Sequence, residues 1–201
     1  MERYNLVSIT KRIYDSHLSF FTLKTLKDIL EVRKENSLFS VIKKLLQAGI
    51  LVKIERDKYL LKGVSIHDFA LANFIYQSSY ISFESALNFY GILSQFPYEI
   101  TSVTSKKTVE KTFESKVFVY NHIKKDLFWG YKKQDNFLIA FPEKALLDQL
   151  YLTAKGYKNI GLDEYDLTGI NKTRLKKYLK KYPKTSQFGA AIKVLEGYLH
   201  I

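Results

Sequence analysis

The sequence predicts an α+β fold in two parts, and three observations predict it. Three amphipathic helical segments and two short apolar strands fill the first 63 of the 201 residues. Segments rich in β-branched and aromatic residues then occupy the middle of the chain, which is typical of a sheet. Helical periodicity returns at Pro142 and continues to the end. We therefore expect one domain at residues 1–63 and a mixed domain at residues 64–201, with a small antiparallel sheet and C-terminal helices.

Composition limits the classes of function. The chain is 46% hydrophobic and has no cysteine. It can therefore form folded cores, but it has no disulfide, thiolate metal site or cysteine nucleophile, as in proteins of a reducing compartment. The four histidines lack the spacing of a zinc helix. We expect no metal, no cofactor and a cytoplasmic protein without a signal peptide or membrane span.

The net charge of +12 indicates partners that carry negative charge, such as phosphate backbones or acidic proteins. Residues 1–63 contain 13 Lys and Arg against 7 Asp and Glu, which is net +6, so the remaining residues also carry +6. Because the charge is divided evenly, it does not by itself locate an interface.

Three helices are expected in the first domain. The first covers residues 4–16, and Thr22 is a candidate N-cap for a second that runs to Leu30. A third begins after Asn36 or Ser37. Gly49 can end it in the left-handed conformation that glycine adopts at little cost.

Two short strands follow these helices, at residues 50–54 and 58–62, and the polar residues between them form a turn. Three helices followed by a β-hairpin is the element order of a winged helix-turn-helix domain. In such domains a recognition helix enters the major groove of DNA, and we assign this role to the third helix.

The third helix separates apolar from polar residues. Its apolar stripe is Leu38, Ile42, Leu45 and Leu46, and its opposite face carries Ser40, Lys43, Lys44 and Gln47. The predicted DNA-binding set also contains residues of the preceding turn, the helix start and the hairpin, namely Arg33, Lys34, Asn36, Ser37, Lys53, Arg56 and Lys58. Any soluble amphipathic helix has a polar face, and winged helices also bind proteins. The pattern favours DNA binding and leaves a protein-interaction module as the alternative.

The middle of the chain is predicted to contain two helices and then strands. Ser65 with Asp68 forms a capping pattern before a helix that ends near residue 77. Ser82 is the expected N-cap of a short helix that Gly91 closes. Four segments then have strand character: 99–105, 116–122, 127–132 and 136–141.

Pro142 marks the start of a further helix, because proline suits the first helical position and Glu143 complements the helix dipole. Lys144 and Asp148 lie one turn apart, and we expect them to pair on its exposed flank. The two carboxylates could serve a nuclease only in a different arrangement, with an acidic residue and a Glu-x-Lys or Asp-x-Lys motif on adjacent strands. We therefore expect no catalytic residue here and no enzyme activity.

A second basic surface is predicted near the C-terminus. Residues 172–184 contain seven Lys and Arg and no acid, and Asn171 can cap a helix there. The residues concerned are Lys172, Arg174, Lys176, Lys177, Lys180 and Lys181. They form either a solvated helix face or a surface for nucleic acid or an acidic partner. A last helix is expected over residues 187–199, with Phe188, Ile192, Leu195 and Leu199 on its inner face.

Four segments in order resemble the motifs of the AbiEi family, the antitoxins of type IV toxin-antitoxin systems. They are YISFESALNFYGIL, EITSVTSKK, FVYNHIKKDLFWGY and IAFPEKALLDQLYL. The motif positions are Ser82, Ala86, Leu87, Tyr90, Gly91, Gly130, Pro142, Glu143, Lys144, Ala145, Leu147 and Asp148. We interpret these residues as caps, turns and core contacts.

The resemblance implies a function in phage abortive infection for each domain. The N-terminal domain would repress its own operon by binding inverted repeats in double-stranded promoter DNA. The C-terminal domain would counter a nucleotidyltransferase-like toxin without requiring a stable complex, and the protein would be a monomer or weak dimer. A regulator that has no toxin partner is the alternative.

Overall fold

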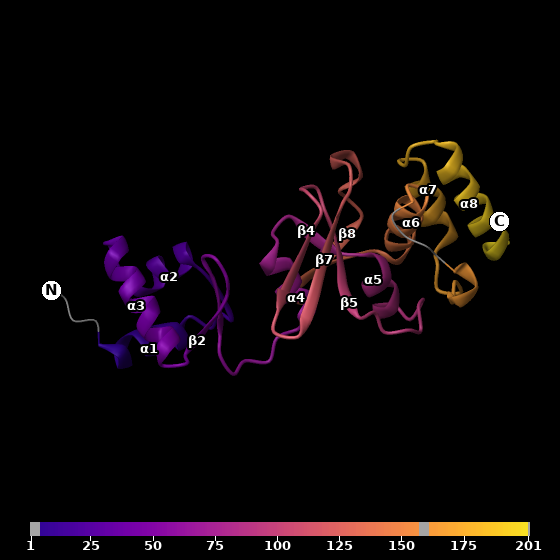
Figure 1. Cartoon of the computed structure of the whole chain (residues 1–201). Helices are drawn as coiled ribbons and strands as arrows, with labels where there is room; N and C mark the ends of the chain where they lie inside the picture. The colour runs from indigo at the N-terminus through magenta and orange to yellow at the C-terminus, as the bar shows by residue number, and fades with distance from the viewer. Residues whose placement is uncertain (1–4, 157–160, 201) are drawn as a thin grey trace. The chain divides into compact units, whose positions relative to one another are not determined.

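The computed structural model of the chain describes residues 5–156 and 161–200 (Figure 1). These residues contain eight α-helices, a three-stranded antiparallel sheet and a six-stranded mixed sheet, so the α+β class is confirmed. Contacts divide the chain into two compact units, Met1–His67 and Asp68–Ile201. No helix in the described residues is both long enough and apolar enough to cross a membrane.

Residues 5–67, the described part of the first unit, form three helices and three strands. In chain order they are α1 (Leu6–Asp15), β1 (Phe20–Thr22), α2 (Leu23–Leu30), α3 (Glu35–Gln47), β2 (Leu51–Glu55) and β3 (Lys58–Leu61). The strand order is β1-β3-β2, so the short strand β1 joins the predicted hairpin as a third strand. Three residues are too few to show an alternating pattern, and the sequence did not indicate β1.

Side-chain chemistry at the helix ends accounts for two of the boundaries in this unit. The Thr22 side chain accepts a hydrogen bond of 3.1 Å from the Thr25 backbone N–H, which confirms Thr22 as the N-cap of α2. Helix α3 begins at Glu35, so the predicted start after Asn36 or Ser37 was wrong. Lys34 occupies the N-cap without a side-chain bond, and the Glu35 carboxylate complements the helix dipole instead.

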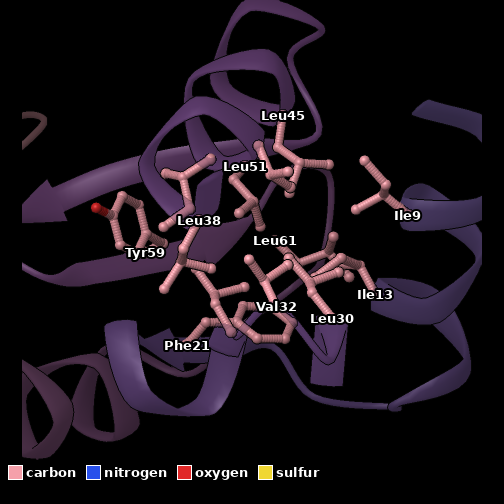
Figure 2. Packing of buried hydrophobic residues seen from close by; sticks show 13 residues of the cluster. Ile9, Ile13, Phe21, Leu30, Val32, Leu38, Leu45, Leu51, Tyr59 and Leu61 are labelled. Atoms are coloured by element: carbon pink, nitrogen blue, oxygen red, sulfur yellow. The ribbon is translucent and has the colours of Figure 1, made fainter. Parts of the chain in front are cut away.

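The core of the first unit is shown in Figure 2, where side chains from the helices and the sheet point toward one another. Its labelled members are Ile9, Ile13, Phe21, Leu30, Val32, Leu38, Leu45, Leu51, Tyr59 and Leu61. Each fully buried aliphatic or phenylalanine side chain contributes about 1.5–3 kcal/mol. This core therefore fixes which face of α3 points inward.

The described residues of the second unit form five α-helices and one sheet. The helices are α4 (Asp68–Ile75), α5 (Phe83–Phe89), α6 (Pro142–Thr153), α7 (Lys172–Leu179) and α8 (Ser186–Leu199). The strands are β4 (Ser79–Ile81), β5 (Glu99–Thr104), β6 (Val109–Phe113), β7 (Lys116–His122), β8 (Tyr131–Gln134) and β9 (Phe137–Ala140). Two short 3₁₀ helices cover Lys125–Leu127 and Leu162–Glu164.

The sheet of the second unit is mixed, so the predicted antiparallel sheet was wrong. Its order is β6-β7-β5-β4-β9-β8, and the pairs β5–β7 and β4–β9 run parallel. The hairpin β6–β7 places its second strand against β5, so β7 runs in the same direction as β5. The sequence pattern did not indicate β4 and β6, and without them the strand directions could not be derived.

Helices α6, α7 and α8 lie together in the C-terminal part of the second unit, and α6 contacts both α7 and α8 (Figure 1). The Asn171 side chain caps α7 by accepting from the Arg174 backbone N–H at 2.9 Å, as predicted. The four predicted inner positions of α8 are all buried. The predicted Ser65 cap was wrong, because α4 begins only at Asp68.

Candidate functional site

The outer face of α3 consists of Ser40, Lys43, Lys44 and Gln47, and all four residues are exposed. The side chains of Leu38, Ile42 and Leu45 on the opposite side are buried in the core. The core therefore holds two ammonium groups and two polar side chains together on one solvent-facing surface. Such a surface can contact phosphates through the lysines and base edges through the serine and glutamine.

The predicted residues at the start of α3 are divided between the turn and the helix. Arg33 and Lys34 lie before α3 and are exposed, so their charges can extend the outer face toward the helix N-terminus. Asn36 and Ser37 lie within the first turn, where Ser37 is half-buried. The Ser40 hydroxyl donates to the Asn36 backbone carbonyl at 3.0 Å, and its oxygen still has acceptor capacity.

The predicted DNA-binding residues of the hairpin differ in exposure and in whether an acidic side chain lies beside them. Lys53 on β2 is exposed, and the Arg56 side chain in the turn is 95% exposed, with Nε 3.6 Å from Asp57 Oδ2. Lys58 Nζ lies 2.6 Å from Glu55 Oε1, and its side chain is only 20% exposed. Arg56 and Lys53 can therefore reach a phosphate more readily than Lys58.

Two exposed residues of α3 did not enter the predicted set, the acidic Glu35 and the aromatic Phe39. Phe39 is 45% exposed and lies one turn before Lys43 on the same flank of the helix. The signal in the sequence was a large apolar residue outside the apolar stripe. An exposed ring at this position can pack against a sugar, a base or a protein side chain.

The predicted second basic surface contains five exposed lysines and one arginine that forms an ion pair. Lys172, Lys176, Lys177, Lys180 and Lys181 are exposed. Arg174 is different, because its guanidinium lies 3.3 Å from the buried carboxylate of Glu143 and 4.9 Å from the centre of the Phe141 ring. Arg174 therefore lies only partly on the predicted outer surface, since its side chain is 41% exposed and also links α7 to α6.

Lys144 and Asp148 pair as predicted by their spacing, but they are buried and do not lie on an exposed flank. Lys144 Nζ donates to Asp148 Oδ1 and, at 2.8 Å, to the Tyr182 hydroxyl. Asp148 also accepts hydrogen bonds from the hydroxyls of Tyr80 (3.1 Å), Ser82 (2.9 Å) and Tyr182 (2.7 Å). Ser82 therefore occupies the N-cap position of α5 while its side chain bonds to α6.

Burial is the main cause of the pKa shifts in this network. Burial lowers the pKa of the Lys144 ammonium below its ordinary value, and the nearby Asp148 carboxylate offsets part of that change. Burial and the same carboxylate raise the pKa of Tyr80 and of Tyr182 well above the usual range. These side chains are at most 4% exposed, so a substrate cannot reach them in this conformation. The network instead joins β4, α5 and α6 to the segment after α7.

Glu143, at the N-terminus of α6, connects this helix to the start of α7. Its side chain is 1% exposed and accepts hydrogen bonds from the Asn171 backbone N–H and from Arg174, at 2.9 and 3.3 Å. Burial first, and then the Glu143 charge, raise the pKa of Tyr90 to about 12. Among the described residues, no group of three or more His, Cys, Asp or Glu side chains could hold a metal ion.

A scan against protein-family models and a search of curated proteins found no match to this chain.

Proposed function

We propose that the first unit is a winged helix-turn-helix that binds duplex DNA, with α3 as its recognition helix and the β2–β3 hairpin as its wing. The observation that carries this proposal is the outer face of α3, where Lys43 and Lys44 are exposed opposite the buried apolar stripe. Three helices with a small antiparallel sheet support it, because that is the element order of such domains.

We further propose that the chain is an AbiEi-type antitoxin of a type IV system. It represses its own operon through inverted repeats and counters a nucleotidyltransferase-like toxin in the cytoplasm, without enzyme activity of its own. This proposal is supported by the resemblance of the four motif segments. Three of the motif residues, Ser82, Lys144 and Asp148, meet in one buried network, as residues that define a fold are expected to do.

The test of DNA binding is fluorescence anisotropy of the full chain on its own upstream DNA and on a shuffled duplex, at two salt concentrations. We expect the native duplex to bind at least about tenfold tighter, which is about 1.4 kcal/mol. The Lys43→Ala, Lys44→Ala double variant should lose affinity. If both lysines contact phosphates, the slope of the logarithm of the binding constant against the logarithm of the salt concentration becomes shallower by about two in this variant.

The matched control is Lys124→Ala with Lys125→Ala, an adjacent exposed pair in the second unit that removes the same charge. Equal loss in both double variants would show that only net charge is acting. Unchanged affinity in the Lys43, Lys44 variant would refute the assignment of α3 as the recognition helix.

Antitoxin activity is tested by co-expressing the chain with a nucleotidyltransferase-like reading frame adjacent to its gene. We expect growth to be restored, and to remain restored in the Lys43, Lys44 variant, because toxin neutralisation is assigned to the second unit. No restoration of growth would leave a regulator that acts without a toxin.

A protein-interaction module is the second candidate function, and Phe39 is the observation that favours it. Its ring is 45% exposed on the flank of α3, and exposed aromatic residues are common anchors of protein interfaces. A stoichiometric complex with the toxin that Phe39→Ala abolishes, together with equal binding to both duplexes, would support this candidate over the repressor.

A further inference from the structure

A groove of about 560 Å³ runs between α7 and α8 in the second unit. Leu179, Phe188 and Ile192 contribute apolar lining, and the latter two are buried residues of the helix pair. The lysines at positions 176, 180 and 184 also line it, against one acid, Glu196, so its charged side chains sum to +2. We call it the α7–α8 groove. Its volume falls in the range of about 300–1,000 Å³ that takes a small ligand or a few side chains.

Two aromatic side chains protrude elsewhere on the same unit. Phe96 is 91% exposed and Tyr98 is 88% exposed, and we call this pair the aromatic knob. The loop that carries them is held in place, because the Asn88 side chain donates to the backbone carbonyls of Leu93 and Gln95 at 3.0 and 3.1 Å. A held loop presents the rings to a partner with little further loss of conformational entropy.

The surroundings of the aromatic knob are acidic, although the whole chain carries +12. Residues 85–105 contain one acid, Glu99, which follows Tyr98, and residues 161–171 contain three acids; neither stretch has a Lys or Arg. The structure brings these stretches together, since the Asp166 backbone N–H donates to the Ile92 carbonyl at 2.8 Å, and Leu93 bridges to Tyr165. The side chain of Glu164, which accepts from Gln95 at 3.5 Å, therefore lies beside the loop that bears the knob.

We infer that the aromatic knob of one copy of this chain docks in the α7–α8 groove of a second copy. The two surfaces complement each other, because exposed rings with acidic neighbours meet an apolar lining with lysines. Within one chain the rings of the knob are exposed to solvent, and no residue of the knob lines the groove, so the knob is not docked there. The contact can be reciprocal in a two-fold dimer or can continue from copy to copy. It involves only the second unit and is independent of DNA binding.

The test is the oligomeric state of the full chain, measured by sedimentation velocity without DNA up to about 100 µM, a range that detects weak interfaces of small area. We expect association that increases with concentration and weakens in about 1 M salt, where the Debye length is about 3 Å. Phe96→Ala with Tyr98→Ala should weaken it roughly a hundredfold, as the loss of two central aromatic anchors does. Lys180→Glu with Lys184→Glu should weaken it as well.

The decisive experiment mixes the two variants. Each is expected to be monomeric alone, whereas an equimolar mixture should form a heterodimer, because one intact knob and one intact groove remain. Lys106→Glu with Lys107→Glu is the control, since it makes the same charge change at exposed residues beyond the C-terminal end of β5. A monomeric wild-type chain, or a mixture that stays monomeric, overturns the proposal. Equal loss in the control would show that net charge acts instead of the groove.

Discussion

Replacing Asp148 with Asn removes the carboxylate that balances the buried ammonium of Lys144. The other contacts of Lys144 Nζ remain, namely the Tyr182 hydroxyl at 2.8 Å and the rings of Trp129, Tyr182 and Tyr80 at 5.0, 5.2 and 5.7 Å. Breaking a buried pair from one side costs about 3–5 kcal/mol, because a charge is left uncompensated. We therefore expect Asp148→Asn to lower the free energy of unfolding of the second unit by about that amount.

Proton loss from Lys144 sets an upper limit to this cost. Releasing a proton at pH 7 from an amine with an ordinary pKa of 10.5 costs about 5 kcal/mol, at about 1.4 kcal/mol per pH unit. In the variant the pKa of Lys144 falls further, so the unfolded chain binds one more proton than the folded chain between the lowered folded pKa and 10.5. Stability then rises with pH in that window, and the cost of Asp148→Asn should shrink as the pH is raised from 7 toward 10.5.

Lys144→Met is expected to cost less than Asp148→Asn. The Asp148 carboxylate would keep three hydroxyl donors, from Tyr80, Ser82 and Tyr182, and such hydrogen bonds stabilise a buried carboxylate. In Asp148→Asn, the Lys144 ammonium keeps only neutral acceptors, the Tyr182 hydroxyl and the amide oxygen of the new side chain. The difference should be at least about 1 kcal/mol, since a hydrogen bond to a charged group contributes about 1.5–3 kcal/mol.

The assay is urea denaturation followed by tryptophan fluorescence. Trp129 is the single tryptophan of the chain and lies beside Lys144, so the signal reports on the second unit. Lys116→Met is the control, because it breaks a pair with Asp68 whose side chains are 46% and 37% exposed, and it should cost less than about 1 kcal/mol. A cost of Asp148→Asn no larger than this control, or a cost that grows as the pH rises, would refute the reasoning.

Three further predictions concern stability at single positions. Gly130→Ala should destabilise the second unit by about 1–3 kcal/mol in the same urea assay, because φ is +77° and the added Cβ would lie 2.9 Å from Lys144 Cγ. Gly91→Ala is the control, since Gly91 also has a positive φ, +71°, but open space around the added Cβ, and it should cost less. Equal costs of the two substitutions would contradict the role of the Lys144 contact. Glu143→Gln should speed hydrogen exchange of the α7 amides by roughly tenfold, since the Asn171 N–H and Arg174 lose a charged acceptor. Unchanged exchange rates in α7 would show that these hydrogen bonds do not stabilise the helix. Thr22→Ala should lower the local stability of α2 by about 1 kcal/mol, measured by exchange of its amides, whereas Thr22→Ser should retain the cap; equal behaviour of the two variants would argue against capping by the hydroxyl.

The sequence by itself determined the features that depend on residues within one helical turn of each other. The Thr22 cap, the Asn171 cap, the inner positions of α8 and most of the apolar stripe of α3 follow from spacing and side-chain chemistry. In that stripe Val41 is buried and was not predicted, and Leu46 is only partly buried. The exposed position of Lys43 and Lys44 follows from the same stripe, so most of the candidate DNA-binding face could be predicted. Phe39 lies outside that stripe and was missed, because the predicted set was chosen from polar and charged side chains.

Only the tertiary structure decided that α6 is covered on all sides, because every residue from Glu143 to Leu152 is buried. The spacing of Lys144 and Asp148 permits an ion pair on any face of a helix, exposed or buried. Their burial results from Tyr80 and Ser82, more than 60 residues earlier, and from Tyr182, which follows α7. The direction of β7 depends in the same way on its distant pairing with β5. Contacts between residues far apart in the chain leave no local periodicity, so the mixed sheet and the buried ion pair became evident only in the folded molecule.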